Sequence, residues 1–269
     1  MPPNAAEAPA EITVRDLRAG YGRHSPPALG GLTARVPRGA LTALVGPNGS
    51  GKSTLLGVLA GVIRPASGTV ERRPGAGRPA FVVQRSAASD ALPLTVREAV
   101  AMGRWARRGP WRPLTRRDRA AVDACLERLG IRELAGRQLG AVSGGQRQRA
   151  LVAQGLAQES GLLLLDEPAA GLDRPAQDRI RAVLAESTAA GTTVVQATHD
   201  LDEALAADHC LLLAGGRLLA EGPPAAVLTP AALDRAWAVP RPQRVTVNEV
   251  QAPSVETTSP SMRFGSEPG

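Results

Sequence analysis

The fold is decided by one stretch, Gly46-Pro47-Asn48-Gly49-Ser50-Gly51-Lys52-Ser53, which matches the pattern G-x-x-x-x-G-K-[ST] at every fixed position. An apolar run at residues 41–45 precedes it and predicts a buried strand, and a helical pattern follows at residues 53–60. Strand, glycine-rich loop and helix in this order are the context in which the pattern forms a phosphate-binding loop. The alternative is an ordinary glycine-rich turn before a buried helix, and the motifs farther along the chain argue against it.

The spacing within this loop has a direct physical reason. Its glycines permit backbone torsions that a Cβ atom would forbid, so that consecutive N–H groups can converge on an anion. The helix that begins near Lys52 adds its positive end. We expect Lys52, the only lysine of the chain, to reach the β- and γ-phosphates of a nucleotide. The Ser53 hydroxyl is expected to bind Mg²⁺.

Length and composition limit the class of protein. With 269 residues, 43% of them hydrophobic, the chain suits one large domain or two small ones. No apolar segment approaches the ~18 residues of a membrane span, and residues 1–10 lack a signal-peptide pattern. The net charge of +7 comes from scattered arginines, which favours a surface near anionic lipid over a nucleic-acid groove. Cys125 and Cys210 match no metal-binding spacing and are predicted to be buried thiols in a reducing compartment.

Two later strands are predicted to end on polar residues. Four leucines at residues 162–165 run into Asp166 and Glu167, and a buried strand at residues 192–197 is followed by His199. Ligands bind at the carboxyl edge of an open parallel sheet. We therefore expect Asp166 to hold Mg²⁺ opposite Ser53, Glu167 to orient or polarise an attacking water, and His199 to face the γ-phosphate. The other two histidines, His24 and His209, have no such context and are predicted to be structural.

Between these strands the chain predicts a compact helical region. Helices are expected at residues 94–107, with Thr95 and Glu98 as a capping box, and at residues 115–129. Neither carries a heptad repeat, which excludes a long coiled coil. Trp105 and Trp111 lie there among arginines, and they serve either local packing or a docking face for a partner.

A second capping-box pattern opens the next helix, which is expected to end near residue 158. It consists of Ser143, Gly144, Gly145 and Gln146. Two adjacent glycines weaken a helix, so they make sense if another group must approach the backbone closely. An ordinary helix cap is the alternative for this segment by itself.

The remaining segments predict the periphery of the fold. Strands are expected at residues 11–17, 68–72 (an edge strand) and 79–84, and a helix from Pro175 to about residue 189. A hairpin is expected from strands at 210–214 and 217–222, followed by short helices at 223–228 and 230–238. Residues 1–10 and 239–269 have the composition of disordered ends. Tyr21, the only tyrosine, is either a packed turn aromatic or a platform for an adenine ring.

Taken in order, these motifs resemble those of the ATP-binding cassette family, the ATPase subunits of ABC transporters, over residues 11–238. The resemblance rests on Tyr21, the loop at 46–53, Gln84, the signature Val142-Ser143-Gly144-Gly145-Gln146, the pair Asp166-Glu167, and His199. Val142 stands where leucine is usual, and Gly171 where alanine is common; both are small departures. The resemblance implies an α/β P-loop NTPase of the RecA-like type, with a mixed sheet core. It also implies an N-terminal antiparallel β subdomain and an inserted helical subdomain at about residues 90–158.

The resemblance also implies a role for each matching residue, with ATP and Mg²⁺ as the bound groups. Tyr21 would stack on adenine, Gln84 would sense the γ-phosphate and the metal, Glu167 would be the catalytic carboxylate, and His199 would contact the γ-phosphate. Mg²⁺ would be held by Ser53, Gln84 and Asp166. The family works as a dimer, in which Ser143 and Gly145 of one subunit close on ATP held by the other. Gly144 and Gln146 of the same signature would also contact that nucleotide. The phosphates would be held by Gly46, Pro47, Asn48, Gly49, Ser50, Gly51, Lys52, Ser53 and Thr54.

The same resemblance implies a peripheral protein at the cytoplasmic face of the membrane. It would dock on integral membrane permease subunits that work with an extracytoplasmic substrate-binding protein, and it would bind no nucleic acid. Residues 81–85, 92–96 and 102–104 are similar to ATPases of zinc and manganese uptake systems, and siderophore importers have similar ATPases. Three other interpretations are an export ATPase, a regulatory cassette without catalysis, and a soluble cassette ATPase acting on DNA or ribosomes. The last class usually has long coiled coils or two cassettes in one chain, and the regulatory class is disfavoured by Glu167 and His199.

Overall fold

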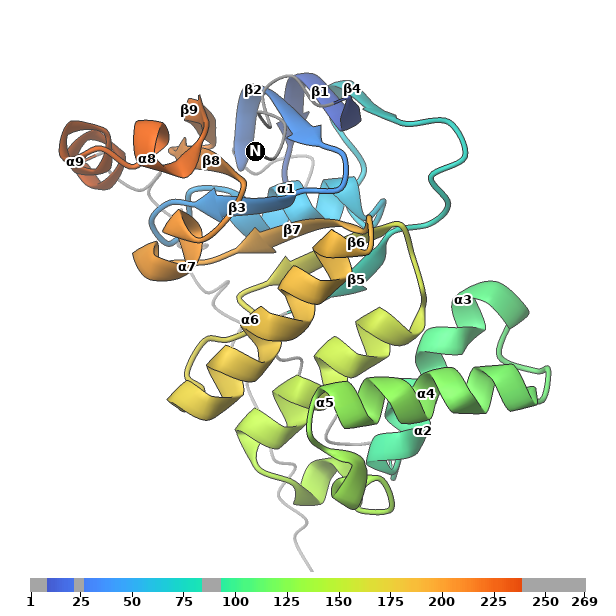
Figure 1. Ribbon diagram of the computed structural model, residues 1–269. Helices are drawn as coiled ribbons and strands as arrows, with labels where there is room; N and C mark the ends of the chain where they lie inside the picture. The colour runs from blue at the N-terminus through green and yellow to red at the C-terminus, as the bar shows by residue number, and fades with distance from the viewer. Residues whose placement is uncertain (1–8, 22–26, 84–92, 239–269) are drawn as a thin grey trace, which may run out of the picture.

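The computed structural model describes residues 9–21, 27–83 and 93–238. Two sheets form the upper part of the molecule in Figure 1, and a lobe of helices lies below them. The smaller sheet is antiparallel, in the order β2-β1-β4. Its strands are β1 (Ala10–Ala19), β2 (Leu29–Pro37) and β4 (Ser67–Arg72). The predicted edge strand at residues 68–72 is thus confirmed as β4.

The larger sheet has the order β5-β6-β7-β3-β8-β9, parallel except for the antiparallel edge strand β9. This order follows the chain except that β3 lies between β7 and β8. Its strands are β3 (Leu41–Val45), β5 (Ala80–Val82), β6 (Leu162–Asp166), β7 (Thr193–Ala197), β8 (His209–Ala214) and β9 (Arg217–Gly222). This mixed core and the antiparallel sheet beside it confirm the predicted fold class.

Helix α1 (Lys52–Leu59) lies between the two sheets and fixes the end of the loop before it. Its buried leucines share one core with β1, β2 and the upper face of the large sheet. Alternation along β6 divides that strand between two cores, since Leu162 and Leu164 face α1 while Leu163 and Leu165 face the helical lobe.

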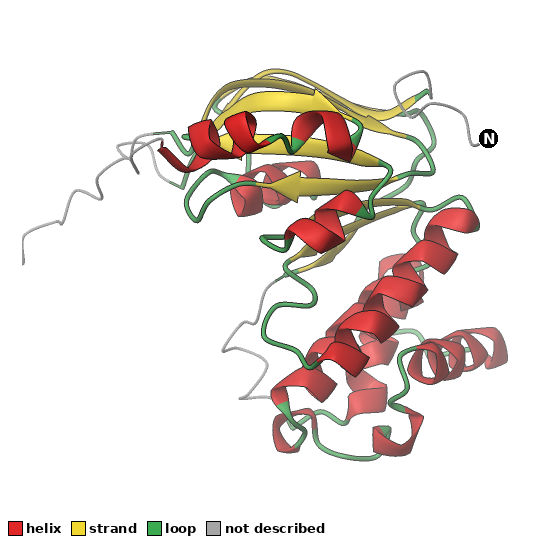
Figure 2. Ribbon diagram, turned by 60° about the vertical axis from the view of Figure 1, so that its left-hand side comes forward, coloured by secondary structure: helices red, strands yellow, loops and turns green. Residues whose placement is uncertain are grey.

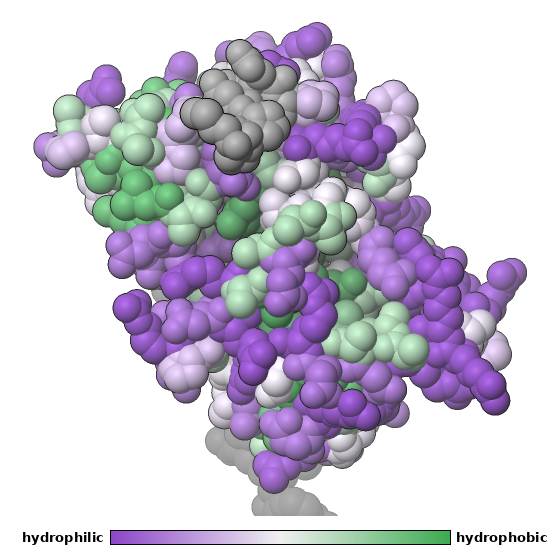
Figure 3. Space-filling model, viewed as in Figure 1, coloured by the Kyte–Doolittle hydropathy of each residue, from purple (hydrophilic) through white to green (hydrophobic). Residues whose placement is uncertain are grey.

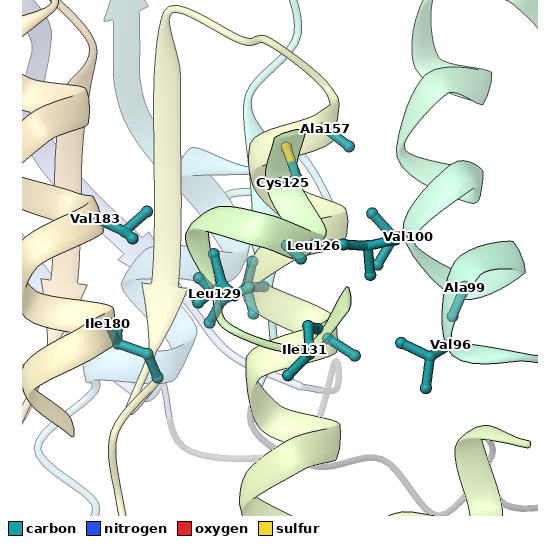
Figure 4. Packing of buried hydrophobic residues seen from close by; sticks show 14 of the residues in the cluster. Val96, Ala99, Val100, Cys125, Leu126, Leu129, Ile131, Ala157, Ile180 and Val183 are labelled. Carbon is teal, nitrogen blue, oxygen red and sulfur yellow. The ribbon is translucent and has the colours of Figure 1, made fainter. Parts of the chain in front are cut away.

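The helical lobe lies between β5 and β6 in the sequence and packs on the lower face of the large sheet. Figure 4 shows Val100, Leu126, Leu129 and Ile131 meeting there, with Ile180 of α6 (Arg174–Ala189) nearby. Its elements are α2 (Val96–Ala101), the 3₁₀ turn Met102–Arg104, α3 (Trp105–Arg108), α4 (Arg116–Arg128), the 3₁₀ turns Arg132–Leu134 and Leu139–Ala141, and α5 (Gly144–Ala157). Both predicted capping boxes are present, and a third joins Thr115 to Asp118.

The C-terminal part of the described chain completes the sheet layer. Helix α7 (Leu201–Leu205) follows β7, and α8 (Pro224–Val227) and α9 (Pro230–Ala238) pack beside β8 (Figure 2). Cys125 and Cys210 are both buried free thiols, as predicted, and burial raises the pKa of the Cys210 thiol to about 12. Among the residues described, no helix is long and apolar enough to span a bilayer.

One strand was missed and one expectation about local structure was wrong. Strand β2 was not predicted, because Gly30 and Gly31 interrupt the alternation of its apolar residues. The single helix expected at residues 94–107 is instead α2, a 3₁₀ turn and α3. The turn contains Gly103, which packs so tightly that a Cβ atom there would lie 2.2 Å from the Gln154 carbonyl oxygen of α5. The α-helix thus gives way to a 3₁₀ turn at the point where it packs closely against α5.

Candidate nucleotide site

The loop between β3 and α1 holds conformations that only glycine tolerates. Gly46 has φ 153° and Gly51 has φ 103°. A Cβ atom would lie 2.2 Å from the Leu213 carbonyl oxygen at Gly46, and 2.6 Å from Leu29 Cδ2 at Gly51. Gly51 is also the N-cap of α1 and has no side chain to cap the first turn. The first N–H groups of α1 therefore remain available to an anion.

Lys52 lies inside the loop that it is expected to serve. Its side chain is buried, and Nζ donates hydrogen bonds to the carbonyl oxygens of Gly46 at 2.8 Å and Pro47 at 3.2 Å. Burial lowers the pKa of Lys52, and the charges of Glu167 and Asp166 oppose that shift. A phosphate oxygen entering the loop would compete for the same ammonium protons.

The ends of three neighbouring strands bring the acidic pair to this loop. Ala197 of β7 pairs with Asp166 on one side and with Leu44 on the other, so the ends of β6, β7 and β3 share one edge of the sheet. Asp166 is buried, and the exposed Ser53 donates a hydrogen bond to it. Burial raises the pKa of Asp166, Glu167 raises it further, and Ser53 and Lys52 oppose the rise.

This donor set fits Mg²⁺. A hydroxyl and a carboxylate are the hard oxygen ligands that the ion takes, and it usually completes its shell with phosphate oxygens and water. No cluster of three or more His, Cys, Asp or Glu residues able to hold a metal occurs in the described part of the chain. A single hydroxyl and a single carboxylate leave most of the shell of the ion to phosphate oxygens and water.

Glu167 sits in a strained backbone conformation at the same edge. Its φ is 49°, in the left-handed region that costs a non-glycine residue about 1–3 kcal/mol. Its N–H donates to the Ala197 carbonyl oxygen at 3.1 Å, and its Oε2 lies 3.6 Å from His199 Nδ1. The His199 side chain is 62% exposed and that of Glu167 only 14%. The strained turn thus places a sheltered carboxylate beside a histidine that solvent can reach.

The segment that carries His199 is fixed by a residue that sequence reasoning missed. Glu203 accepts hydrogen bonds from Gln196 Nε2 at 2.7 Å and from Thr198 Oγ1 at 2.8 Å. It also borders a cavity of about 50 Å³ shared with Glu167 and His199, which is room enough for water. The available signal was its place four residues after His199, in the first turn of α7.

Tyr21 lies near the start of α1. Its hydroxyl accepts a hydrogen bond from Thr54 Oγ1 at 3.2 Å, and the residue is 72% exposed. This exposure does not fit a packed turn aromatic, and it leaves a ring face available for stacking. Gln84, the remaining predicted member of the site, lies outside the described residues.

The signature segment stands apart from these groups. Helix α5 begins at the far end of the helical lobe from α1, as Figure 1 shows. Ser143 Oγ accepts from the Gln146 N–H at 3.2 Å, and both Ser143 and Gly144 are exposed. A Cβ atom on Gly145 would meet Leu172 Cδ2 at 3.4 Å, an ordinary contact. Leu172, in the loop after Glu167, was not predicted from the sequence, and it places that loop against the start of α5.

Comparison with known proteins agrees with this geometry. Residues 29–170 match the ABC transporter family. A hemin import ATP-binding protein of Streptomyces coelicolor is 40% identical over 250 residues, covering 89% of this chain and 87% of that protein. The chain belongs to the ABC transporter family. It is an ATP-binding cassette, and such cassettes are ATPases.

Two further matches support the assignment of this cassette. A zinc import ATP-binding protein of Cereibacter sphaeroides is 41% identical, covering 71% of this chain and 74% of that protein. The solved structure of an ATP-binding cassette of an ABC transporter in its ADP conformation is 25% identical with a TM-score of 0.72. It covers 86% of this chain and 99% of that one. The resemblance inferred from the sequence motifs is confirmed.

Proposed function

We propose that two copies of this cassette enclose ATP–Mg²⁺, each copy offering its phosphate loop to one nucleotide and its signature segment to the other. The observation that supports this is the contrast between the two sets of glycines. The chain itself requires glycine at 46 and 51, whereas it has room for a side chain at Gly145. An exposed helix start that keeps glycine without an internal need suits a phosphate approaching from a second copy.

Within one such site, each described residue has a distinct task. Lys52 and the loop N–H groups hold the β- and γ-phosphates, and Tyr21 stacks on adenine. Ser53 and Asp166 would hold Mg²⁺, with Gln84 joining them, and the ion would neutralise charge on the phosphate oxygens. Glu167 orients a water for attack on the γ-phosphorus, and the bond to the ADP oxygen breaks to give ADP and phosphate. His199, next to Glu167, contacts the γ-phosphate.

Closing and reopening of the two copies would move a membrane permease and so power import. The cassette would lie at the cytoplasmic face of the membrane, with an extracytoplasmic binding protein supplying the solute. We propose a transition metal as cargo, with zinc or manganese as the first choice and a chelate such as hemin or a ferric siderophore as the second. The support is that relatives are named for zinc, manganese, hemin and ferric enterobactin transport.

Mixing two inactive variants tests the shared site. Lys52→Ala removes the phosphate grip, and Gly145→Ala obstructs the signature segment. We expect each variant alone to lose most ATPase activity and an equimolar mixture to regain part of it, because one composite site in the mixed dimer is intact. Absence of rescue, with both variants folded and mixed dimers shown by cross-linking, would exclude a site shared between copies.

A second variant tests the role of the carboxylate. Glu167→Gln should bind ATP and accumulate as a nucleotide-bound dimer in size-exclusion chromatography, with hydrolysis reduced about a hundredfold or more. Wild-type hydrolysis by this variant would show that another group orients the water. Cargo is tested by uptake of labelled zinc, manganese and hemin in cells with and without the gene. Equal uptake of all three in both strains would exclude these cargoes and leave the ATPase assignment unaffected.

A further inference from the structure

Arginines are scattered along the chain, but the expectation that the net charge is scattered with them was wrong, because most of them are balanced by acidic residues outside one segment. Residues 104–119, which we call the basic arm, contain seven arginines and a single acidic residue, Asp118. The arm thus carries a net charge of +6, against +7 for all 269 residues. It connects α2 to α4 through α3, and neither the nucleotide site nor the signature segment uses it.

The base of the arm is firmly anchored. Arg104 is buried, and its Nε donates to Asp118 Oδ1 at 3.0 Å while its Nη1 donates to the Ala157 carbonyl oxygen of α5 at 2.7 Å. Asp118 in turn caps α4 through Thr115. Because this polar cluster is buried and its groups are paired, it fixes both ends of the arm on the helical lobe.

The outer end of the arm is left to solvent. Arg112, Arg116, Arg117 and Arg119 are exposed, and within the described ranges none of them has an ion pair. Trp111 is 94% exposed between them. In Figure 1 the loop between α3 and α4 projects at the right-hand side, and Figure 3 shows hydrophilic residues covering that end of the lobe.

We propose that the basic arm binds the anionic headgroup surface of the membrane, with Trp111 entering the interfacial region. Each arginine close to an anionic bilayer strengthens binding about fivefold, and tryptophan favours the boundary between headgroups and hydrocarbon. The arm projects as a convex tip, which suits a broad planar surface. A single-stranded nucleic acid instead needs a groove that follows its backbone. The proposal assumes the membrane location of the proposed function, but it requires no permease.

Vesicle binding tests this with a matched control. The arm variant R112Q/R116Q/R117Q/R119Q is compared with R38Q/R64Q/R217Q/R235Q, which removes the same number of exposed arginines elsewhere. We expect the wild type and the control to co-sediment with phosphatidylglycerol vesicles and much less with phosphatidylcholine vesicles. The arm variant should bind at least about tenfold more weakly, and high salt should weaken the binding of the wild type.

Tryptophan fluorescence locates the contact. W105F/W237F leaves Trp111 as the only tryptophan, and brominated anionic lipid should quench its emission. Three results would overturn the proposal: equal binding by the arm and control variants, no quenching of Trp111, or tighter binding to a single-stranded oligonucleotide than to anionic vesicles. ATPase activity of the arm variant is measured in parallel. If the arm variant keeps its ATPase activity but loses vesicle binding, this surface is separate from the nucleotide site. If the wild-type protein shows no ATPase activity at all, that result contradicts only the proposed function.

Discussion

Two glycine-containing segments of the cassette differ in what requires their glycines. In the phosphate loop, Gly46 and Gly51 adopt positive φ angles and touch the rest of the chain so closely that no side chain fits. In the signature segment, Gly145 is helical and has room for a side chain beside Leu172. The first segment is complete within one chain, and the second has a composition that one chain does not explain.

This difference corresponds to where the two segments lie in the fold. The phosphate loop is held between two sheets by the core around α1, and Asp166, Glu167 and His199 meet it at one sheet edge. The signature segment lies at an exposed helix start on the helical lobe, away from the phosphate loop. Leu172, in the loop that follows Glu167, lies beside Gly145 at the start of this helix.

The largest expected effect comes from disturbing the self-contained segment. Gly46→Ala forces a Cβ atom against the Leu213 carbonyl oxygen at a φ that alanine disfavours. We expect the free energy of unfolding to fall by about 2–4 kcal/mol and ATP binding to be lost. Urea unfolding and titration with a fluorescent ATP analogue measure both. Normal stability with normal binding would show that the loop does not depend on glycine there.

The matching change in the signature segment should have a different outcome. Gly145→Ala is expected to leave the free energy of unfolding within about 1 kcal/mol of wild type, because the added methyl group has room and alanine favours a helix. ATPase activity should fall by about tenfold to a hundredfold as the methyl group keeps the second copy away from the nucleotide. ATP binding to the single chain should persist. Unfolding of this variant would mean that the chain requires this glycine after all.

A smaller effect is expected where the sheet edge is braced. Glu203→Ala leaves the buried Gln196 amide and Thr198 hydroxyl without their acceptor. The free energy of unfolding should therefore fall by about 1–3 kcal/mol. Because His199 follows Thr198 directly, kcat should fall severalfold while KM for ATP changes little. Asp202→Ala, on the exposed neighbour in α7, is the control and should alter neither value appreciably. Equal effects of the two variants would show that Glu203 has no bracing role.

The smallest expected effect is a pH dependence of the free energy of unfolding, which should differ in sign between the sheet edge and the helical lobe. Burial raises the folded-state pKa of Asp166, so the folded protein keeps this proton to higher pH than the unfolded chain does. Its contribution to stability is therefore lost as pH rises from about 4 through the folded pKa. Asp166→Asn should stabilise the nucleotide-free protein at pH 7, and the gain should disappear toward pH 4. Urea unfolding at several pH values measures this gain.

Asp118, in the helical lobe, supplies the control of opposite sign. Hydrogen bonds from Thr115, together with Arg104, lower its pKa to about 2. Its stabilising contribution is present above the unfolded pKa and is lost as pH falls toward 2. Asp118→Asn should therefore destabilise the protein at pH 7, and the difference should shrink in acid. The same direction of change for both variants would contradict the assigned environments.

Much of the site could be predicted from local sequence, since each motif belongs to one strand, loop or helix start. The run of four leucines predicted β6 because a fully buried parallel strand needs apolar residues on both faces. The capping boxes were equally local, because their partners stand three residues apart. Strand β2 was missed because Gly30 and Gly31 interrupt its local alternation, and the break at Gly103 was missed because it involves a distant partner, Gln154.

The sequence by itself determined the phosphate loop, the acidic pair and the two helix caps, because torsional freedom, alternation and capping act over a few residues. That Asp166, Glu167 and His199 share one edge was also expected, but only the tertiary structure decided that the Glu167 carboxylate lies 3.6 Å from His199 and that the helix opened by Ser143 begins far from this edge. It also decided that Gly46 is enclosed and Gly145 is not. Such relations depend on which distant strands and helices pack together, and no short stretch of sequence carries that information.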